Sequence, residues 1–337
     1  MGKIAVLGAG SWGTALSIVL ADNGHEVRLW GHSAKVIDEI NGRHSNEAYL
    51  PKIQLPNNIN GYTTLSDALH GVTTVLLVVP TKAIREVLGK IRNIISSPLT
   101  IIHASKGLEP KSYKRISEIV SEEIPNYLIN DIVALSGPSH AEEVALRQPT
   151  TITAAAENIQ VAQFVQNLFM NPYFRVYTNN DVIGVEIGGA LKNIIALGAG
   201  ISDGLGYGDN AKAAIVTRGL NEITRLGLVL GANPLTFIGL SGVGDLLVTC
   251  TSIHSRNWRA GQLFGKGYNL EEVLNNVGMV VEGIRTAEAV YHLSKIIGVE
   301  MPITNAIFDI IFKGQDPRET VGILMNRDGK GEAQLVI

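Results

Sequence analysis

Short runs of hydrophobic, mostly β-branched residues recur through the first half of the chain, with longer helix-like segments between them. One run, Thr74–Val79, has the sequence TVLLVV and precedes Pro80, which is typical of a strand buried on both faces of a parallel sheet. We predict strands at Lys3–Leu7, Glu26–Trp30, Thr74–Val79, Leu99–His103, Ile132–Ser136, Thr150–Ala154 and Phe174–Tyr177. Strands that alternate with helices indicate an α/β domain with a mainly parallel sheet.

The pattern changes after about Asn180, where strand-like runs give way to long segments with helical periodicity. We predict helices within Val182–Ile201, Asn210–Leu226, Asp245–Cys250, Leu270–Asn275, Ile284–Lys295 and Ala306–Phe312. An all-α second domain follows from this pattern. We therefore predict two domains, residues 1–180 and residues 181–337, which also suits the length of the chain.

Composition and charge exclude several classes of protein. Hydrophobic residues make up 45% and charged residues 18%, so the composition is not that of a disordered chain. The net charge is −3, and the chain has no run of Lys or Arg of the kind that would indicate nucleic-acid binding. The most apolar long window, Val182–Ile201, contains Glu186 and Lys192, which argues against membrane insertion. The single cysteine, Cys250, fits a reducing compartment.

We therefore expect a soluble cytoplasmic protein that acts on a small molecule. The first hydrophobic run, Ile4–Leu7, is too short for the core of a signal peptide. We expect no metal site, and the oligomeric state stays open, with a homodimer among the alternatives.

A glycine-rich turn follows the first predicted strand and opens the first predicted helix. Its sequence, Gly8-Ala9-Gly10-Ser11-Trp12-Gly13, has the spacing Gly-x-Gly-x-x-Gly. In a Rossmann-like domain these glycines allow a tight turn, a close approach to a pyrophosphate, and close helix–strand packing. The turn therefore predicts a dinucleotide site, and the alternative is a purely structural turn.

The acidic residue expected at the end of the second strand is missing. The strand is followed by Gly31-His32-Ser33, and Lys35 lies just beyond. An acid there would bind the ribose 2′-hydroxyl of NAD, whereas this cluster tolerates a 2′-phosphate. We predict NADP, or both NADP and NAD, as the cofactor. The alternative is that His32 is only an exposed loop residue.

Several polar residues at strand ends and in apolar surroundings are candidates for chemistry. Lys106 and the stretch Gly137–Ala141 follow predicted strands, where α/β sheets bind ligands. Ser139 is alternatively a helix cap. Lys192 has apolar or glycine neighbours, and burial would lower its pKa and make it a usable acid or base. The alternative is a lysine at a domain interface whose head group reaches solvent.

The predicted helical domain carries two further motifs. Asp245 and Thr249 are spaced to share a helix face, although Asp245 is alternatively a cap. In Ser255-Arg256-Asn257 we predict a helix start with Ser255 as its cap, which is a suitable clamp for a phosphate unless Arg256 is only a surface ion-pair residue. These groups together suit reduction of a ketone in a small phosphorylated molecule.

The chain resembles the bacterial NAD(P)-dependent glycerol-3-phosphate dehydrogenases over essentially its whole length. The resemblance rests on GAGSWGTAL from Gly8, ASKGLE from Ala104, LSGPSHA from Leu135, VEIGGALKNIIA from Val185, GVGDLLVTC from Gly242, SRN from Ser255 and VEG from Val281. It implies reduction of dihydroxyacetone phosphate to sn-glycerol 3-phosphate, a precursor of glycerophospholipids.

The resemblance also implies roles for individual residues. Lys192 corresponds to the catalytic proton donor and acceptor. The implied substrate-binding residues are Lys106, Gly137, Ser139, Lys192, Asp245, Ser255, Arg256 and Asn257. The implied cofactor-binding residues are Gly8, Gly10, Ser11, Trp12, Gly13, His32, Lys106, Ala141, Arg256, Val280 and Glu282.

Two other functions remain as alternatives. One is a related two-domain reductase of another hydroxy acid, similar to the 6-phosphogluconate or ketopantoate enzymes. The other is a dinucleotide sensor without catalysis. The clamp at Ser255–Asn257 favours a phosphorylated substrate over the first alternative, and a desolvated Lys192 would have no purpose in the second.

Overall fold

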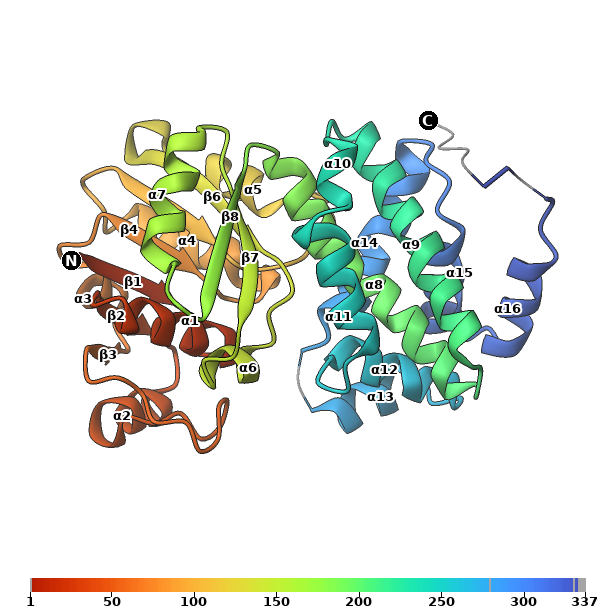
Figure 1. The fold of residues 1–337 in the computed structure, drawn as a ribbon, viewed down its shortest axis with the longest axis horizontal. Coiled ribbons are helices and arrows are strands. Elements are labelled where there is room, and N and C mark those ends of the chain that lie inside the picture. The colour runs from red at the N-terminus through yellow and green to blue at the C-terminus, as the bar shows by residue number, and fades with distance from the viewer. Residues whose placement is uncertain (1, 279, 330, 333–337) are drawn as a thin grey trace. The chain divides into compact units, whose positions relative to one another are not determined.

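The computed structural model describes residues 2–278, 280–329 and 331–332, and the chain folds into two compact units (Figure 1). The α/β unit comprises Met1–Ser105 and Ile116–Val182, and the helical unit comprises Lys106–Arg115 and Ile183–Ile337. The sequence predicts a single boundary at residue 180, whereas the units divide after Val182 and exchange one short segment. The short segment Lys106–Arg115 leaves the α/β unit and belongs to the helical unit.

The α/β unit is built on one eight-stranded sheet of order β3-β2-β1-β4-β5-β6-β7-β8. Its strands are β1 (Lys3–Leu7), β2 (Glu26–Trp30), β3 (Ile59–Tyr62), β4 (Thr74–Leu77), β5 (Leu99–His103), β6 (Ile129–Ser136), β7 (Thr150–Ala155) and β8 (Phe174–Asn179). All neighbouring strands are parallel except β6 and β7, which are antiparallel. The α/β fold with a mainly parallel sheet is confirmed. The sequence pattern missed β3, whose residues INGY have no hydrophobic run.

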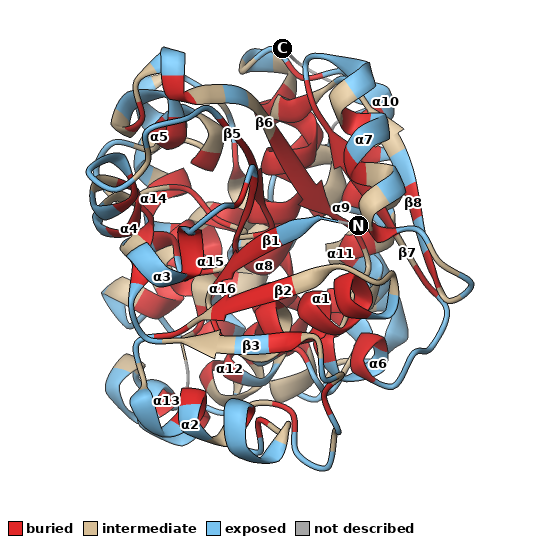
Figure 2. Ribbon diagram, turned by 90° about the vertical axis from the view of Figure 1, so that its left-hand side faces the viewer, coloured by how far each residue is buried: buried red, intermediate tan, exposed pale blue. Residues whose placement is uncertain are grey.

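Helices cover both faces of this sheet. They are α1 (Ser11–Asp22), α2 (Ala34–Arg43), α3 (Leu65–Leu69), α4 (Ile84–Arg92), α5 (Ile116–Glu123), α6 (Ala141–Ala145) and α7 (Ile159–Phe169), with short 3₁₀ turns η1 (Thr81–Ala83) and η2 (Asn126–Leu128). In β1, Ile4 and Val6 join the core formed with α1, α2, α6 and α7, while Ala5 and Leu7 join the core formed with α3, α4 and α5. Side chains of a strand alternate between faces, so burial on both faces explains the continuous hydrophobic runs. Figure 2 shows the inner strands as largely buried.

The helical unit consists of nine α-helices among its described residues, together with one π-helical turn. They are α8 (Val182–Gly204), α9 (Asp209–Val229), α10 (Pro234–Phe237), α11 (Asp245–Thr251), α12 (Arg256–Gly265), α13 (Leu270–Val277), α14 (Glu282–Ile296), α15 (Pro302–Lys313) and α16 (Pro317–Met325), with the π-turn η3 (Leu240–Gly244) before α11. The predicted all-α second domain is confirmed, although α10 and α16 had no clear periodic signal.

Helix α8 is the central helix of this unit. It is long and apolar enough to cross a membrane, but 94% of its most apolar window is buried inside the protein. It is therefore a core helix, and its residues Ile187, Leu191 and Ile194 pack in the core of the helical unit. This burial places Glu186 and Lys192, its two long charged side chains, in surroundings that are mostly apolar.

Candidate active site

The glycine-rich turn has the geometry of a phosphate-binding turn. Gly8 has φ +131°, and a Cβ atom there would lie 2.5 Å from the carbonyl oxygen of Val78. A Cβ atom at Gly13 would lie 1.8 Å from the carbonyl oxygen of Gly8, so any other residue would push α1 away from the turn. At Gly10, the N-cap of α1, a Cβ atom would meet nothing within 4 Å. The turn is therefore tight where helix and strand meet and open at the helix N-terminus.

A buried side chain that sequence reasoning missed holds this turn. Asn46 is fully buried, and its Nδ2 donates to the carbonyl oxygen of Ala9 at 3.1 Å and to Thr14 Oγ1 at 2.9 Å. Ser11 donates through Oγ to the carbonyl oxygen of Tyr49 at 2.9 Å, and Trp12 packs against the adjacent core. Nothing in the sequence pattern around Asn46 connects it with the turn, because the contact joins distant positions.

The end of β2 lies beside this turn, because the backbone nitrogen of Gly8 donates to the carbonyl oxygen of Trp30 at 2.9 Å. His32 follows and is exposed, and Ser33 is the N-cap of α2. Lys35 is exposed in the first turn of that helix. The segment His32–Lys35 therefore lies next to the glycine turn, and no acidic residue directly follows the end of β2.

The stretch after β6 lies on the same edge of the sheet, since β1, β4, β5 and β6 run parallel. Gly137 follows the strand directly. Ser139 does not cap the next helix, because the N-cap of α6 is His140 and Ser139 Oγ instead donates to the carbonyl oxygen of Gly137 at 2.9 Å. Ala141, the first residue of α6, is buried where α6 packs against α1.

Two lysines in the helical unit share one buried aspartate. Asp245 has no exposed surface, and its Oδ2 accepts a hydrogen bond from Lys106 Nζ at 2.7 Å. Its Oδ1 accepts from Lys192 Nζ. Lys192 also donates to Thr249 Oγ1 at 2.8 Å, and the Thr249 hydroxyl donates to the carbonyl oxygen of Asp245 at 2.6 Å. The pattern that placed Asp245 and Thr249 on one helix face thus brings both to Lys192.

This arrangement excludes the alternative roles considered for Asp245 and Lys192. Asp245 is not a helix cap, since the N-cap of α11 is Gly244 and the carboxylate binds lysines instead. Lys192 is 7% exposed, and its ammonium group binds Asp245 and Thr249 instead of extending into solvent. Two ammonium groups against one carboxylate leave the cluster with a net positive charge, which suits an anionic ligand.

The pKa of Lys192 is lowered to about 8. Burial is the main cause, because it disfavours the charged form, and the nearby Lys106 ammonium acts in the same direction. The Asp245 carboxylate opposes both by favouring the ammonium form. Near neutral pH, Lys192 can therefore both donate and accept a proton. The neighbouring Cys250 is a poor candidate nucleophile, because burial raises its pKa to about 12.

The predicted helix start at Ser255–Asn257 has the expected form. Ser255 caps α12, its Oγ accepting from the backbone nitrogen of Trp258 at 3.2 Å. Arg256 is exposed and donates to the carbonyl oxygen of Val280 at 3.2 Å, and it forms no ion pair with any residue in the described ranges. The Asn257 side chain is used within the protein, since it donates to Asn193 Oδ1 at 2.8 Å.

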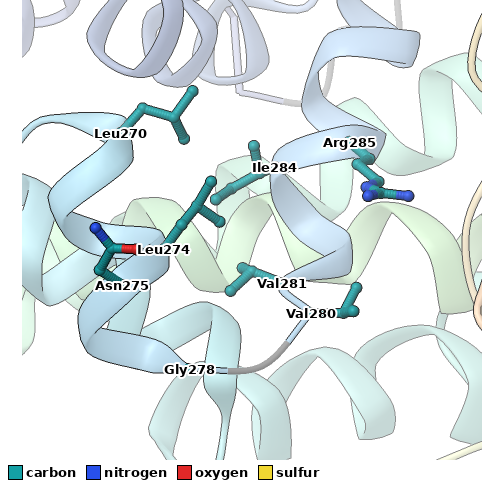
Figure 3. A pocket seen from close by; sticks show the side chains of 8 residues that line it. All are labelled: Leu270, Leu274, Asn275, Gly278, Val280, Val281, Ile284 and Arg285. Atoms are coloured by element: carbon teal, nitrogen blue, oxygen red, sulfur yellow. The ribbon is translucent and has the colours of Figure 1, made fainter.

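Val280 and Glu282 lie where the chain enters α14. Arg256 contacts the carbonyl of Val280, and Glu282 is the first residue of the helix. Val280 also lines a pocket of about 570 Å³ (Figure 3). The residues that line this pocket are Leu270, Leu274, Asn275, Gly278, Val280, Val281, Ile284 and Arg285. The pocket is mostly apolar, and Lys106, Lys192 and Asp245 are not among its lining residues.

Family models and curated relatives that match this chain describe the same enzyme. Residues 3–162 match the model of the NAD-dependent glycerol-3-phosphate dehydrogenase N-terminus, and residues 181–322 match that of the corresponding C-terminus. The glycerol-3-phosphate dehydrogenase [NAD(P)+] of Bacillus cytotoxicus is 63% identical over 336 residues, covering 100% of this chain and 98% of that protein.

Solved structures resemble this chain to different degrees. Glycerol-3-phosphate dehydrogenase from Coxiella burnetii superposes with a TM-score of 0.92 at 40% identity, over 97% of this chain and 99% of the other. A ketopantoate reductase from Ralstonia eutropha gives a TM-score of 0.60 at 13% identity, over 95% and 99% of the two chains. The second likeness concerns the fold alone.

Proposed function

Because the chain belongs to the NAD-dependent glycerol-3-phosphate dehydrogenase family, we propose a specific role in its reaction for each charged residue around Lys192. The enzyme interconverts dihydroxyacetone phosphate and sn-glycerol 3-phosphate, with NAD or NADP as cofactor. The observation that carries the proposal is the buried Lys192 ammonium, bonded to Asp245 and Thr249.

The glycine turn of the α/β unit fits the cofactor's pyrophosphate. Gly10 leaves space at the N-terminus of α1, where backbone amides and the helix dipole favour an anion. A side chain at Gly8 or Gly13 would collide with backbone atoms, which explains why glycine is needed there. The bound cofactor supplies a hydride to the ketone carbon or accepts one from the alcohol. Ser11, Trp12, Ala141, Val280 and Glu282 are proposed to complete its binding.

Lys192 is proposed to act on the oxygen at the reacting carbon. During reduction negative charge develops on this oxygen, and the ammonium stabilises that charge and donates a proton. During oxidation the neutral amine accepts the proton of the alcohol. Asp245 and Thr249 both accept hydrogen bonds from the Lys192 ammonium, so the lysine has little freedom to lose when the substrate binds.

The other two positively charged side chains, Arg256 and Lys106, are proposed to bind the anionic end of the substrate. Arg256 lies at the N-terminus of α12, where a phosphate gains both a charged partner and a helix terminus. Lys106 neutralises the second oxygen of Asp245 and adds positive charge beside Lys192. We also propose that Gly137 and Ser139 of the α/β unit and Ser255 and Asn257 of the helical unit are substrate-binding residues. Asn257 acts partly by fixing Asn193, which follows Lys192 on α8.

We place the reaction in the cytoplasm and connect its product with glycerophospholipid synthesis. The buried, unpaired Cys250 supports a reducing compartment.

The pH dependence of the two directions tests the role of Lys192. Ketone reduction needs the ammonium form, so its kcat/KM is expected to fall as pH rises through about 8. Alcohol oxidation needs the amine form, so its kcat/KM is expected to rise through the same value. The control is Lys192→Arg, which keeps a charge that does not titrate and should remove both transitions. Parallel profiles in the two directions would contradict the assignment.

Cofactor choice is tested at the end of β2. His32→Asp is expected to raise the KM for NADPH by about tenfold or more relative to that for NADH, because the new carboxylate repels a 2′-phosphate. The measurement is kcat/KM with each cofactor at saturating ketone. His70→Asp is a matched control, since His70 is another exposed histidine of the α/β unit. Equal effects on NADPH and NADH would place His32 away from the 2′-phosphate.

A further inference from the structure

The segment Lys106–Arg115 follows β5 and precedes α5, both in the α/β unit, yet it belongs to the helical unit. Leu108 is 2% exposed and packs in the core of the helical unit, and Tyr113 packs against the same core. The segment is therefore seated on the helical unit by its own apolar side chains. Its first residue, Lys106, is one of the two lysines bound to Asp245.

Ion pairs fix both ends of this segment. At its start, Lys106 Nζ lies 2.7 Å from Asp245 Oδ2, which belongs to α11. At its end, Arg115 Nη1 lies 2.6 Å from Glu186 Oε2, which belongs to α8, the helix of Lys192. The side chains of Arg115 and Glu186 are 16% and 4% exposed, so this pair is largely removed from water.

The backbone between the two ion pairs is closed and strained. The backbone nitrogen of Tyr113 donates to the carbonyl oxygen of Glu109, and the nitrogen of Glu109 donates to that of Lys114, both at 2.9 Å. Lys111 and Tyr113 have φ angles of 76° and 62°, which L-residues seldom adopt. Such conformations persist only where the surroundings hold them, and they concentrate at functional sites.

A contribution to stability does not by itself explain why an ion pair is buried. Removing two charges from water is costly, and apolar residues of similar size often stabilise a core equally well. The Arg115–Glu186 pair does something that an apolar contact does less well, because it fixes one end of the segment in a single position on α8. The other end of the segment then has a defined place from which Lys106 reaches Asp245.

We propose that Arg115 and Glu186 are positioning residues that act through Lys106, holding its ammonium group on Asp245 beside Lys192. Neither residue touches the substrate in this proposal. The proposal rests on the function assigned to Lys106 above, so its test has to separate a failure of that role from a failure of the positioning.

The test is a double-mutant cycle on the full-length enzyme. Arg115→Met and Glu186→Gln are each expected to lower kcat/KM for dihydroxyacetone phosphate by about 10- to 100-fold, since small misplacement of a site residue is costly. In a Lys106→Ala background the same substitutions are expected to cost almost nothing more. Arg85→Met is the matched control, because Arg85 pairs with Glu122 and Glu123 in the α/β unit.

A second readout follows the segment itself. Lys111 is exposed within it, and trypsin is expected to cleave there faster in Arg115→Met and Glu186→Gln than in the wild type or in Arg85→Met. A purely stabilising ion pair would change the melting temperature without this local change or the dependence on Lys106. If Arg115→Met does not fold, Glu186→Gln, which keeps the shape of the side chain, carries the whole cycle.

Each outcome decides the matter. If Lys106→Ala leaves kcat/KM unchanged, the role of Lys106 fails and the positioning proposal fails with it. If Lys106→Ala is impaired but Arg115→Met and Glu186→Gln match the wild type, only the positioning proposal is overturned. Equal losses in both backgrounds also overturn it, because Arg115 and Glu186 would then act independently of Lys106.

Discussion

Replacing Lys192 with alanine is expected to lower kcat for ketone reduction by at least about 10²–10⁴-fold, the usual contribution of a general acid. The lost stabilisation of the developing oxyanion should add to this effect. The dissociation constant of NADPH is expected to stay nearly unchanged, because the proposed contact of Lys192 is with the substrate oxygen, whereas the glycine turn is proposed to bind the pyrophosphate. Steady-state kinetics and a fluorescence titration of NADPH measure the two quantities.

The matched control is Lys313→Ala, which removes an exposed lysine paired with Asp309 on α15 of the same unit. It should leave kcat unchanged. A melting curve is needed for Lys192→Ala, since the variant leaves the buried Asp245 with one cationic partner fewer. Near-normal turnover in a folded Lys192→Ala protein would show that another group donates the proton.

Replacing Arg256 with alanine is expected to act mainly on binding. The arginine would hold the phosphate in the ground state and the transition state alike, so the KM for dihydroxyacetone phosphate should rise by about 10- to 100-fold. This range corresponds to the loss of one hydrogen bond to a charged group. The kcat should change much less, apart from any loss of orientation. Arg259→Ala is the matched control, since it removes another exposed arginine from the same helix.

A rescue experiment sharpens this second prediction. Phosphite added together with unphosphorylated dihydroxyacetone should increase the rate of NADPH oxidation by the wild type, because it fills the phosphate site without a covalent link. The increase should be much smaller in Arg256→Ala. An unchanged KM in Arg256→Ala, or equal rescue of both proteins, would place the phosphate elsewhere.

Much of the fold follows from local sequence. Strands β1, β2 and β5 have the bounds that the sequence predicts, because hydrophobic residues dominate a strand that is buried on both faces. The short edge strand β3 was missed, since Asn60 and Gly61 obscure any run. The antiparallel pairing of β7 with β6 also has no local signal, as it depends on the path of the chain between them.

The site was predictable in its parts but not in its connections. Apolar neighbours pointed to a buried Lys192, and helical spacing placed Asp245 with Thr249. The contact between Lys106 and Asp245 joins positions far apart in the chain, so no local pattern reports it. The same holds for Arg115 with Glu186, where an ordinary loop arginine and a helix glutamate become a buried pair only through folding.

If Lys192 and Arg256 act as proposed, a desolvated lysine and a phosphate clamp make this chain a reductase of a small phosphorylated ketone. The most direct measurement is the rate of NADPH oxidation by the purified protein with dihydroxyacetone phosphate and with unphosphorylated dihydroxyacetone. We expect kcat/KM for the phosphorylated ketone to be larger by about 10⁴-fold or more, as is usual where a site is built to bind a polar group that the analogue lacks. Equal activity on both ketones, or activity only on an unphosphorylated hydroxy acid, would contradict it.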